Sequence, residues 1–256
     1  MFSGKSLKFI SYNIWFNEFN FEARSKEILK LCEKKDPDVI CLQEVTGPFM
    51  THLMDSNFIK SNFYISNVPF QLRNWYDIVI LSKFCCNAYV MPFLSKMSRK
   101  LLYITMYNKE NELIKIGTTH LESMNNLFKR ETQLIDSYRI LDRIEKNTNQ
   151  KAKYSFLMGD FNFTERDNKY IEKAGYTDQG LNEISKTGKI EIWNTMKCMK
   201  GYPAWRPDRF TYKNYSNTFQ VNKFEIIGND PITRETFFNP VGTPSDHYGL
   251  YVECSL

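Results

Sequence analysis

The stretch that indicates the fold reads Tyr154-Ser155-Phe156-Leu157-Met158-Gly159-Asp160-Phe161-Asn162. Its first five residues form an apolar run with the length of a short buried strand. Gly159 permits a tight turn or a close backbone approach, and Asp160 and Asn162 point the same way if the chain stays extended. A carboxylate and an amide at a strand end suit the activation of a water beside a phosphate. The structural alternative is an Asp/Asn turn that follows the strand.

Polar side chains recur at the ends of the other apolar strands that the sequence predicts. A carboxylate buried there without a partner is very costly, so it needs an ion pair or a metal ion. Glu44 could instead cap a helix that begins near Thr46, and His52 is expected on a helix surface without a role. Five such strand ends together favour one shared site over separate structural roles. The strand-end residues are Asn13, Glu44, His120, Asp160 with Asn162, and Asp246 with His247.

The periodicity of apolar residues predicts strands and helices throughout the chain. Helices are expected over residues 21–34 and 126–144, and a shorter helical piece over about 165–173. Residues 176–215 are expected to be irregular and are rich in aromatic side chains. The predicted strands cover residues 7–14, 39–42, 76–81, 85–91, 101–107, 113–119, 154–158, 219–227 and the segment 245–252.

Composition favours one large domain over residues 1–256. The chain is 42% hydrophobic, and it contains no Pro/Gly/Ser-rich linker and no internal repeat. Its net charge of +5 is compatible with a polyanionic partner but does not establish one. No run of about eighteen apolar residues and no signal peptide are found, which predicts an intracellular protein, in the nucleus or cytoplasm, with no membrane contact. The six cysteines lack metal-site spacing and are expected to be reduced thiols.

The residues at the strand ends suggest phosphodiester hydrolysis assisted by a hard cation. Mg²⁺ prefers oxygen ligands and is often held by one or two carboxylates together with phosphate oxygens of the substrate. Glu44 is therefore the first expected ligand. The sequence contains no His-x-x-x-His pair or cysteine cluster that would indicate zinc.

The remaining strand-end residues suit proton transfer and charge stabilisation. Asp160 would orient or deprotonate the attacking water, while Asn162 would hold that water or a phosphate oxygen. His247, positioned by Asp246, would donate to the phosphorane as charge builds on it. His120 would act as a second donor or as a general acid for the leaving group. A serine-based acyl-transfer site fits poorly, because no G-x-S-x-G segment is present.

Five short motifs, in chain order, resemble those of the endonuclease/exonuclease/phosphatase superfamily. The resemblance spans nearly the whole chain. It implies a DNase I-like α/β fold, in which two mixed sheets pack face to face as a four-layer α/β/β/α sandwich. The motifs are Asn13, Leu42-Gln43-Glu44, Thr119-His120-Leu121, Gly159-Asp160-Phe161-Asn162 and Ser245-Asp246-His247.

Within this superfamily, four longer segments of the sequence are similar to the tyrosyl-DNA phosphodiesterase 2 family. That similarity implies an Mg²⁺-dependent hydrolase, with Mn²⁺ as a substitute, that cleaves 5′-phosphotyrosyl links between protein and DNA or RNA. It would leave a 5′-phosphate. Lys96 and Arg99, with the aromatic-rich residues 205–215, predict a preference for a single-stranded end. We expect a monomer. The segments that carry the similarity are residues 92–102, 119–123, 130–134 and 245–250.

The resemblance also implies roles for individual residues. Asn13 and Glu44 would serve the metal, Asp160 and Asn162 the water and phosphate, and His247 the transition state. Substrate contacts would come from Arg99, Ser95, Trp205, Tyr212 and Glu225.

The chain departs from the family pattern in three places. Thr164 stands where the family has an arginine, with Arg166 nearby. The nearest match to the Arg-x-Asp motif of the penultimate strand is Lys223-Phe224-Glu225, so Glu225 would replace the aspartate. The ubiquitin-binding extension that precedes the catalytic domain in some relatives is not expected here.

Three other functions are compatible with parts of the sequence. A related nuclease or RNA-end-processing enzyme of the superfamily is the nearest alternative. Residues 203–210 are similar to a segment of inositol polyphosphate 5-phosphatases, although Pro207 breaks the spacing. They could instead form a loop that precedes a Phe-Thr-Tyr strand. A catalytically dead nucleic-acid-binding module is the third alternative, and the intact set of strand-end residues argues against it.

Overall fold

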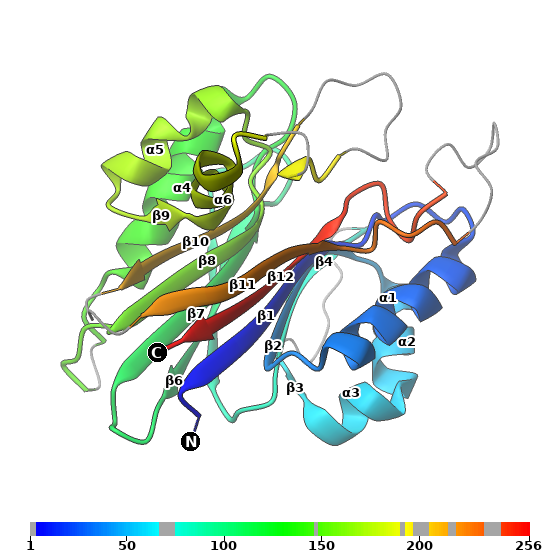
Figure 1. Ribbon diagram of the computed structural model, residues 1–256, viewed down its shortest axis with the longest axis horizontal. Coiled ribbons are helices and arrows are strands. Elements are labelled where there is room, and N and C mark those ends of the chain that lie inside the picture. The colour runs from blue at the N-terminus through cyan, green and yellow to red at the C-terminus, as the bar shows by residue number, and fades with distance from the viewer. Residues whose placement is uncertain are drawn as a thin grey trace.

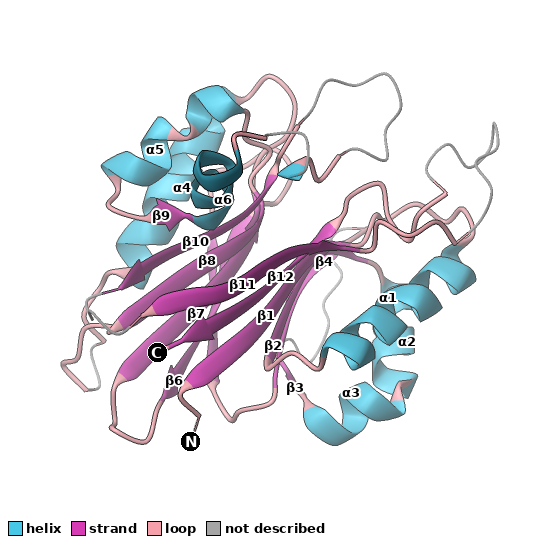
Figure 2. Ribbon diagram, in the orientation of Figure 1, coloured by secondary structure: helices cyan, strands magenta, loops and turns pink. Residues whose placement is uncertain are grey.

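The structure, a computed structural model, describes residues 4–66, 75–145, 148–189, 193–196, 205–214, 219–232 and 242–256. Two six-stranded sheets pack face to face, and helices cover the outer face of each sheet (Figure 1, Figure 2). This arrangement confirms the expected α/β/β/α sandwich of two mixed sheets.

The first sheet contains one parallel pair, β1 with β2, and its other neighbours are antiparallel. Three helices cover its outer face: α1 (Phe21–Lys35), α2 (Gly47–Asp55) and α3 (Asn57–Asn62) (Figure 1). In spatial order the strands are β11 (Gln220–Ile227), β12 (Gly249–Ser255), β1 (Ser6–Asn13), β2 (Val39–Val45), β4 (Asp77–Ser82) and β3 (Tyr64–Ile65).

The second sheet also contains one parallel pair, β7 with β8. Its outer face carries α4 (Leu127–Leu141), the 3₁₀ turn η1 (Glu165–Asp167), α5 (Lys169–Lys173) and α6 (Gln179–Thr187) (Figure 1). In spatial order the strands are β5 (Asn87–Pro92), β6 (Lys100–Tyr107), β7 (Leu113–His120), β8 (Tyr154–Asp160), β10 (Asp208–Asn214) and β9 (Thr177–Asp178).

Apolar side chains fill three layers, one between the sheets and one beneath each set of helices. Between the sheets, the ring centroid of Phe9 lies 5.0 Å from that of Phe156 and 5.5 Å from that of Phe210. All three side chains are buried. Their burial removes a large apolar area from water and fixes the spacing of the two sheets.

Most elements lie where the periodicity predicts them, but the prediction of irregular structure over residues 176–215 is wrong. The described part of that region contains β9, α6 and β10. Helix α6 is short, and its N-terminus is capped by the side chain of Asp178, which accepts a hydrogen bond from the backbone N–H of Gly180. Asp178 is a favoured helix N-cap residue, and it was the local signal for this helix that the prediction did not use.

The strand ends that carry polar residues meet at one end of the sandwich. The parallel strands β1, β2, β7 and β8 all end there, and their antiparallel neighbours β12 and β10 begin there. Asp160 at the end of β8 is paired with Asp208 at the start of β10 and with His120 at the end of β7. Motifs that are far apart in the sequence therefore lie together in one cluster.

Gly159 is required by the close approach of β7 and β8. Its φ is +138°, and a Cβ placed there would lie 2.0 Å from the carbonyl oxygen of Thr119. A larger residue would have to move the backbone that delivers Asp160.

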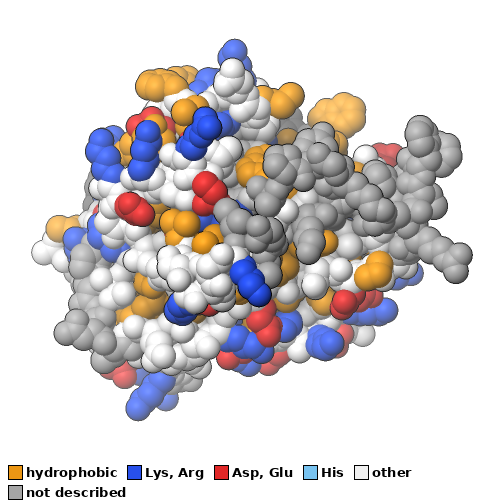
Figure 3. Space-filling view, turned by 45° about the horizontal axis from the view of Figure 1, so that its top comes forward, with side chains coloured by type: hydrophobic (Ala, Val, Ile, Leu, Met, Phe, Trp, Pro, Cys, Tyr) orange, Lys and Arg blue, Asp and Glu red, His pale blue; other side chains and the backbone are white. Residues whose placement is uncertain are grey.

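Some global features can be read from the described part of the chain. Within it, no helix is long and apolar enough to cross a membrane. Five cysteines are free thiols, and Cys198 lies outside the described residues, as do Pro203 and Ala204. Lysine and arginine side chains stand in several separate groups on the face shown in Figure 3. Net charge therefore does not locate a nucleic-acid surface, and the site itself must do so.

Candidate active site

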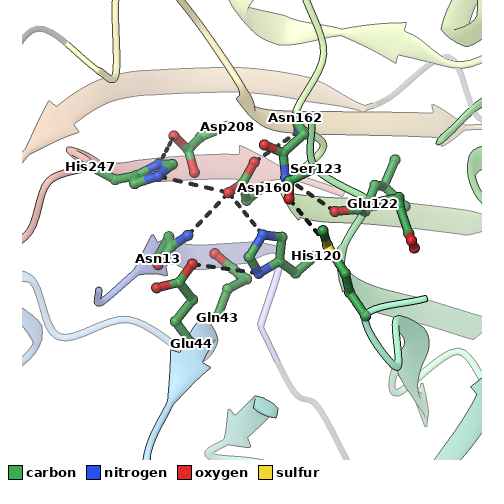
Figure 4. Close-up of polar contacts among 12 residues, drawn as sticks. Asn13, Gln43, Glu44, His120, Glu122, Ser123, Asp160, Asn162, Asp208 and His247 are labelled. Atoms are coloured by element: carbon green, nitrogen blue, oxygen red, sulfur yellow. Dashed lines mark hydrogen bonds and ion pairs between the residues drawn. The ribbon is translucent and has the colours of Figure 1, made fainter. Parts of the chain in front are cut away.

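Asp160 is the centre of the site, buried at the end of β8 (Figure 4). Its Oδ2 accepts a hydrogen bond from Asn13 Nδ2 at 3.1 Å and lies 3.3 Å from His120 Nε2. The backbone N–H of Asn162 donates to its Oδ1 at 2.8 Å. Asn13 comes from the other sheet, so this carboxylate joins the two sheets and has a fixed orientation.

Glu44 is turned toward the site by an irregularity in β2. The pairing of β2 with β4 shifts register between Leu42 and Val45, and the φ of Glu44 is +60°. Such bulges redirect side chains, and a left-handed conformation at a non-glycine residue stores strain that is common at functional sites. The backbone N–H of Phe16 donates to Glu44 Oε2 at 3.0 Å. Helix α2 is capped by Thr46, so Glu44 does not serve as its cap.

The carboxylate of Glu44 is buried among other acidic groups. Burial and, next, the neighbouring charge of Asp246 raise its pKa to about 7. Burial also raises the pKa of Asp246. No lysine or arginine within the described ranges lies at ion-pair distance from Glu44, whose nearest basic group is His120 Nδ1 at 3.9 Å. The site therefore concentrates negative charge that a bound cation would relieve.

His120 is held as a neutral imidazole. Burial and the nearby guanidinium of Arg99 lower its pKa to about 3. With Nε2 directed at Asp160, the proton belongs on that nitrogen, and Nδ1 makes no hydrogen bond to any described residue. This arrangement suits His120 to orient Asp160 and fits poorly with the predicted role as a general acid.

His247 carries the positive charge of the site, and its partner differs from the expected one. Nδ1 lies 2.8 Å from Oδ2 of Asp208, whereas the sequence interpretation gave Asp246 as the positioning acid. Although burial opposes protonation, the carboxylates of Asp208 and Asp160 hold the pKa of His247 well above its usual value. Nε2 lies 3.8 Å from Asp160 Oδ2. The sequence interpretation gave Asp208 no role, because it placed this residue in the loop before a possible Phe-Thr-Tyr strand.

Asn162 lies in the site, although the chain does not stay extended after β8 as the sequence analysis assumed. Its φ is +52°, so the chain turns after Asp160. Its side-chain amide donates to the carbonyl oxygen of Leu121 at 3.1 Å. Asn162 thus ties the loop after β8 to the loop after β7, and its backbone N–H orients Asp160.

Arg99 lies beside His120 and is a buried cation with no acidic partner among the residues that the structure describes. Both side chains line a small cavity of about 20 Å³. The guanidinium lies 5.7 Å from the ring centroid of Tyr76, and Nε has no hydrogen-bond partner among the described residues. The ring of Tyr76 stacks on Phe16 at 5.0 Å. A cation beside aromatic rings would suit an anionic ligand that carries a flat ring. Of these residues, the sequence indicated only Arg99.

Ser95 and Trp205, expected to contact substrate, instead hold loops in place. The hydroxyl of Ser95 donates to Glu122 Oε2 at 2.6 Å and accepts from the backbone N–H of Arg99 at 3.0 Å. The indole N–H of Trp205 donates to the carbonyl oxygen of Phe163 at 2.9 Å. Their polar atoms are therefore engaged within the protein.

Tyr212 and Glu225 lie away from the site. Tyr212 is in the middle of β10, four residues or about 13 Å along the strand from Asp208, and its ring packs 4.6 Å from Phe219. Glu225 forms ion pairs with Lys35 and with Lys223 on the surface of the first sheet. The structure does not bring these two side chains into the cluster of strand-end residues.

Thr164 and the segment similar to 5-phosphatases also have structural roles. Thr164 caps η1 through a reciprocal capping box with Asp167. Arg206 donates both terminal nitrogens to Asp178, each at 2.9 Å, and Arg209 Nη1 lies 2.7 Å from the same carboxylate. Cations paired in the interior are not available to a polyphosphate, which argues against the 5-phosphatase alternative.

Arg24 of α1 supports the site from outside. It is buried, and its guanidinium donates to the carbonyl oxygens of Ile14, Trp15 and Pro244 as well as two others. The loop that supplies the Phe16 N–H to Glu44 and the segment before His247 are thereby fixed together. An arginine in an amphipathic helix gave no signal in the sequence.

The donor set fits a hard divalent cation. Glu44 provides a buried carboxylate without a lysine or arginine partner in the described part of the chain. Asn13 provides an amide nearby, and its Oδ1 accepts a hydrogen bond from the backbone N–H of Trp15 at 3.1 Å. Asp160, Asp208 and His247 form a second buried group, with ligand atoms within 4.8 Å of one another. Oxygen-rich, acidic surroundings of this kind are typical of Mg²⁺ or Mn²⁺ sites and not of structural zinc sites.

Because the carboxylate of Glu44 is buried, its ionisation should lower the stability of the metal-free protein. Its pKa is 4.5 in the unfolded chain and about 7 in the fold, so the metal-free protein loses stability as the pH rises through this window. At pH 8 in EDTA, Glu44→Gln should stabilise the fold by up to roughly 3 kcal/mol, at about 1.4 kcal/mol per pKa unit. Thermal unfolding measures this. Mg²⁺ should then raise the melting temperature of the wild type but not of the variant. A variant less stable than the wild type in EDTA would refute the charge argument.

A family model agrees with this geometry. The model of the Endonuclease/Exonuclease/phosphatase family matches residues 10–247. The chain belongs to this family. The match begins in β1 and ends at His247, so it includes every strand end that builds the site. It establishes the hydrolase fold of the family, and it leaves the substrate open.

Solved structures of family members have the same fold. TDP2 of D. rerio, in complex with a single-strand DNA product, aligns with a TM-score of 0.78 over 99% of this chain and 100% of that chain, at 18% identity. Truncated TDP2 of C. elegans aligns at 0.75 over 99% of both chains, at 20% identity. The human Nocturnin catalytic domain, with bound sulfate, aligns at 0.71 over 100% of this chain and 96% of that chain, at 16% identity. At these identities the likeness concerns the fold alone. The comparison with curated protein sequences found no match.

Proposed function

We propose that this protein is a metal-dependent phosphodiesterase that hydrolyses 5′-phosphotyrosyl links between polypeptide and a nucleic-acid end, leaving a 5′-phosphate. One observation carries the proposal. Six strand ends from two sheets bring an uncompensated carboxylate, a fixed aspartate and a charged histidine to one place. These are the groups that water attack on a phosphodiester requires.

Glu44 and Asn13 are the residues that would hold the cation. When bound there, Mg²⁺ would supply Lewis-acid stabilisation of phosphoryl charge worth several kcal/mol. Asp160 is oriented by Asn13, His120 and the Asn162 backbone, and it holds the attacking water and receives its proton. His247, protonated by its acidic neighbours, donates from Nε2 to the phosphorane oxygen as negative charge develops.

The substrate class is supported by the surroundings of Arg99. Single-stranded nucleic acid is held by cations along its backbone and by aromatic faces on which bases stack, at about 1–3 kcal/mol per base. Arg99 provides the cation, and Phe16, with 46% of its surface exposed, and Tyr76 provide the aromatic faces. The fold of TDP2, tyrosyl-DNA phosphodiesterase 2, in complex with a single-strand DNA product supports the same class.

A comparison of four substrates with the metal-loaded protein tests the proposal. They are 5′-phosphotyrosyl single-stranded DNA, the same adduct on a blunt duplex, a 3′-phosphotyrosyl strand, and unmodified RNA. We expect the 5′ adduct on a single strand to be cleaved fastest and the 3′ adduct poorly. Faster cleavage of the unmodified RNA would favour the nuclease alternative. Equal cleavage of 5′ and 3′ adducts, or binding without turnover, would contradict the proposal.

Arg99→Ala should weaken substrate binding more than it slows the chemical step. Loss of one phosphate contact should raise KM and reduce the slope of log affinity against log salt by about 0.7 for a single strand. Arg139→Ala is the matched control, because the side chain of Arg139 is 72% exposed on α4. A salt slope that is the same for wild type and Arg99→Ala would exclude a phosphate contact by Arg99.

A further inference from the structure

Strand β5 differs from the other edge strands of the two sheets. The edges are β11 and β3 in the first sheet, and β5 and β9 in the second. An edge presents unpaired backbone N–H and C=O groups, and proteins protect it by shortness, charge or bulges. β3 and β9 are two residues long, and β11 carries Lys223, Glu225 and an irregularity in its register. These three edges are therefore protected against pairing with another chain.

β5 carries only one such protection, a proline at its last position. Its six residues, Asn87-Ala88-Tyr89-Val90-Met91-Pro92, include no charged side chain, and they pair with β6 in a continuous register. Five of the six are exposed, with Val90 at 48%. No residue within the described ranges pairs with the outer side of β5. A long, uncharged edge of this kind can accept another extended chain as an added strand.

The hydrogen-bond pattern indicates which groups of β5 face outward. The backbone N–H of Phe93, directly after β5, donates to the carbonyl oxygen of Arg99 at 3.1 Å. In an antiparallel pair such bonds recur at every second residue, so Met91 also bonds to β6. Ala88 and Val90 therefore direct their N–H and C=O groups away from the sheet. These two residues lie about 7 Å apart along the strand, the repeat that an added strand would match.

The edge leads to the active site. Pro92 pairs with Lys100 on β6, and His120 on β7 pairs with Asp160 on β8. The register of β6 with β7 places Lys100 beside His120, and both line the small cavity next to Arg99. Neighbouring strands are about 4.8 Å apart, so three steps give about 14 Å from the end of β5 to Asp160. About four extended residues span that distance.

We propose that the outer edge of β5 binds the polypeptide part of the substrate as an added strand, with Ala88 and Val90 pairing to its backbone. The proposal rests on the phosphodiesterase function proposed above. The tyrosine of a protein adduct carries polypeptide, and this polypeptide leaves the site close to the reacting phosphate. Backbone pairing does not depend on particular side chains, so many sequences can bind. Because β5 has no charged side chain, an uncharged, extended segment fits it best.

The length of the polypeptide arm tests the proposal. The substrates are single-stranded 5′-phosphotyrosyl DNA with a lone tyrosine, and the same adduct with about four or about ten uncharged residues attached on either side of the tyrosine. The shorter arm should leave KM unchanged, because it ends where β5 begins. The longer arm should lower KM roughly tenfold on one side of the tyrosine, with kcat within about twofold, since each backbone hydrogen bond has a modest net effect.

A substitution on the edge removes one pairing group. Val90→Pro removes an outward N–H and keeps the bonds of Met91 to β6, so it should abolish the gain from the longer arm. Turnover of the lone-tyrosine adduct should stay at the wild-type level. Val90→Thr is the matched control, because it keeps the backbone N–H and should keep the gain.

N-methylation of the arm gives the same information if Val90→Pro folds poorly. Methyl groups on one alternating set of amides should abolish the gain, and methyl groups on the other set should leave it, because an added strand bonds through every second residue. Equal effects of the two sets, a gain that survives Val90→Pro, or equal KM values for the two arm lengths would overturn the proposal. A dimer that Val90→Pro dissociates in sedimentation would assign the edge to a second copy of the chain.

Amide hydrogen exchange separates this test from the proposed function. A ten-residue peptide of the same sequence without DNA, at millimolar concentration, should slow exchange at Ala88 and Val90, whereas Met91 is already bonded. If no adduct is hydrolysed but these two amides are protected, the proposed function fails and the pairing at β5 stands. If the lone-tyrosine adduct is hydrolysed and neither protection nor a gain in KM is seen, the function stands and the role of β5 is refuted.

Discussion

Replacing Glu44 with glutamine should abolish Mg²⁺-dependent hydrolysis while the protein remains folded. The substitution keeps the shape of the side chain and its hydrogen bond from the Phe16 N–H, and removes only the charge. A metal ion contributes several kcal/mol of transition-state stabilisation, and each 1.4 kcal/mol is tenfold in rate. We therefore expect a loss of at least about 10³-fold. Initial rates on a chromogenic aryl phosphodiester across a titration of Mg²⁺ measure it.

Two controls test whether the loss of activity comes from the charge of Glu44 and from the metal. Glu225→Gln makes the same chemical change on the surface of β11 and should leave the rate unchanged. EDTA should stop the wild-type reaction, and Mg²⁺ or Mn²⁺ should restore it. Wild-type activity in Glu44→Gln, or activity that survives EDTA, would remove Glu44 as the metal ligand.

Asp160→Asn and His247→Ala should each lower kcat by roughly 10²–10⁴, the range for a positioned proton-transfer group. Asp160→Asn keeps the volume and removes the acceptor of the water proton. His247→Ala removes the donor to the phosphorane oxygen. Neither residue pairs with Arg99, so KM should change much less than kcat. Single-turnover rates at saturating substrate separate the two quantities.

The control for these variants is a histidine outside the site. His52 lies on α2 and contacts Glu22 at 3.1 Å, so His52→Ala should turn over normally. If Asp160→Asn and His247→Ala keep the wild-type kcat and only bind substrate more weakly, both residues are ligand contacts and the proposed chemistry is wrong.

Much of the site could be predicted from sequence because its residues end apolar strands. Glu44 and Asp160 each follow a buried run, and a polar residue there must have a partner. Parallel strands bring such ends together, which is why the motif order predicted a cluster. The structure adds the bulge at Glu44 and the left-handed turn at Asn162, which depend on pairing and not on local pattern.

The rest could not be predicted because it depends on strand parity and on hydrogen-bond partners. Asp208 was missed because a seven-residue strand with Arg209 and Lys213 in it shows no clean apolar alternation. Glu225 matched a motif by spacing, yet its side chain lies on the opposite face of its sheet. Ser95 is in a segment similar to the family, but its hydroxyl is taken by Glu122. A residue type at a motif position does not reveal which of its atoms are already bonded.

Product analysis in ¹⁸O-water tests the central claim most directly. If water held by Asp160 attacks phosphorus, hydrolysis of a 5′-phosphotyrosyl oligonucleotide places one ¹⁸O in the new 5′-phosphate. The released tyrosine stays unlabelled, and the reaction requires Mg²⁺ and Glu44. Mass spectrometry of both products reads this out. Label in the tyrosine, release of a 5′-hydroxyl end, or equal product formation by Glu44→Gln would contradict the account.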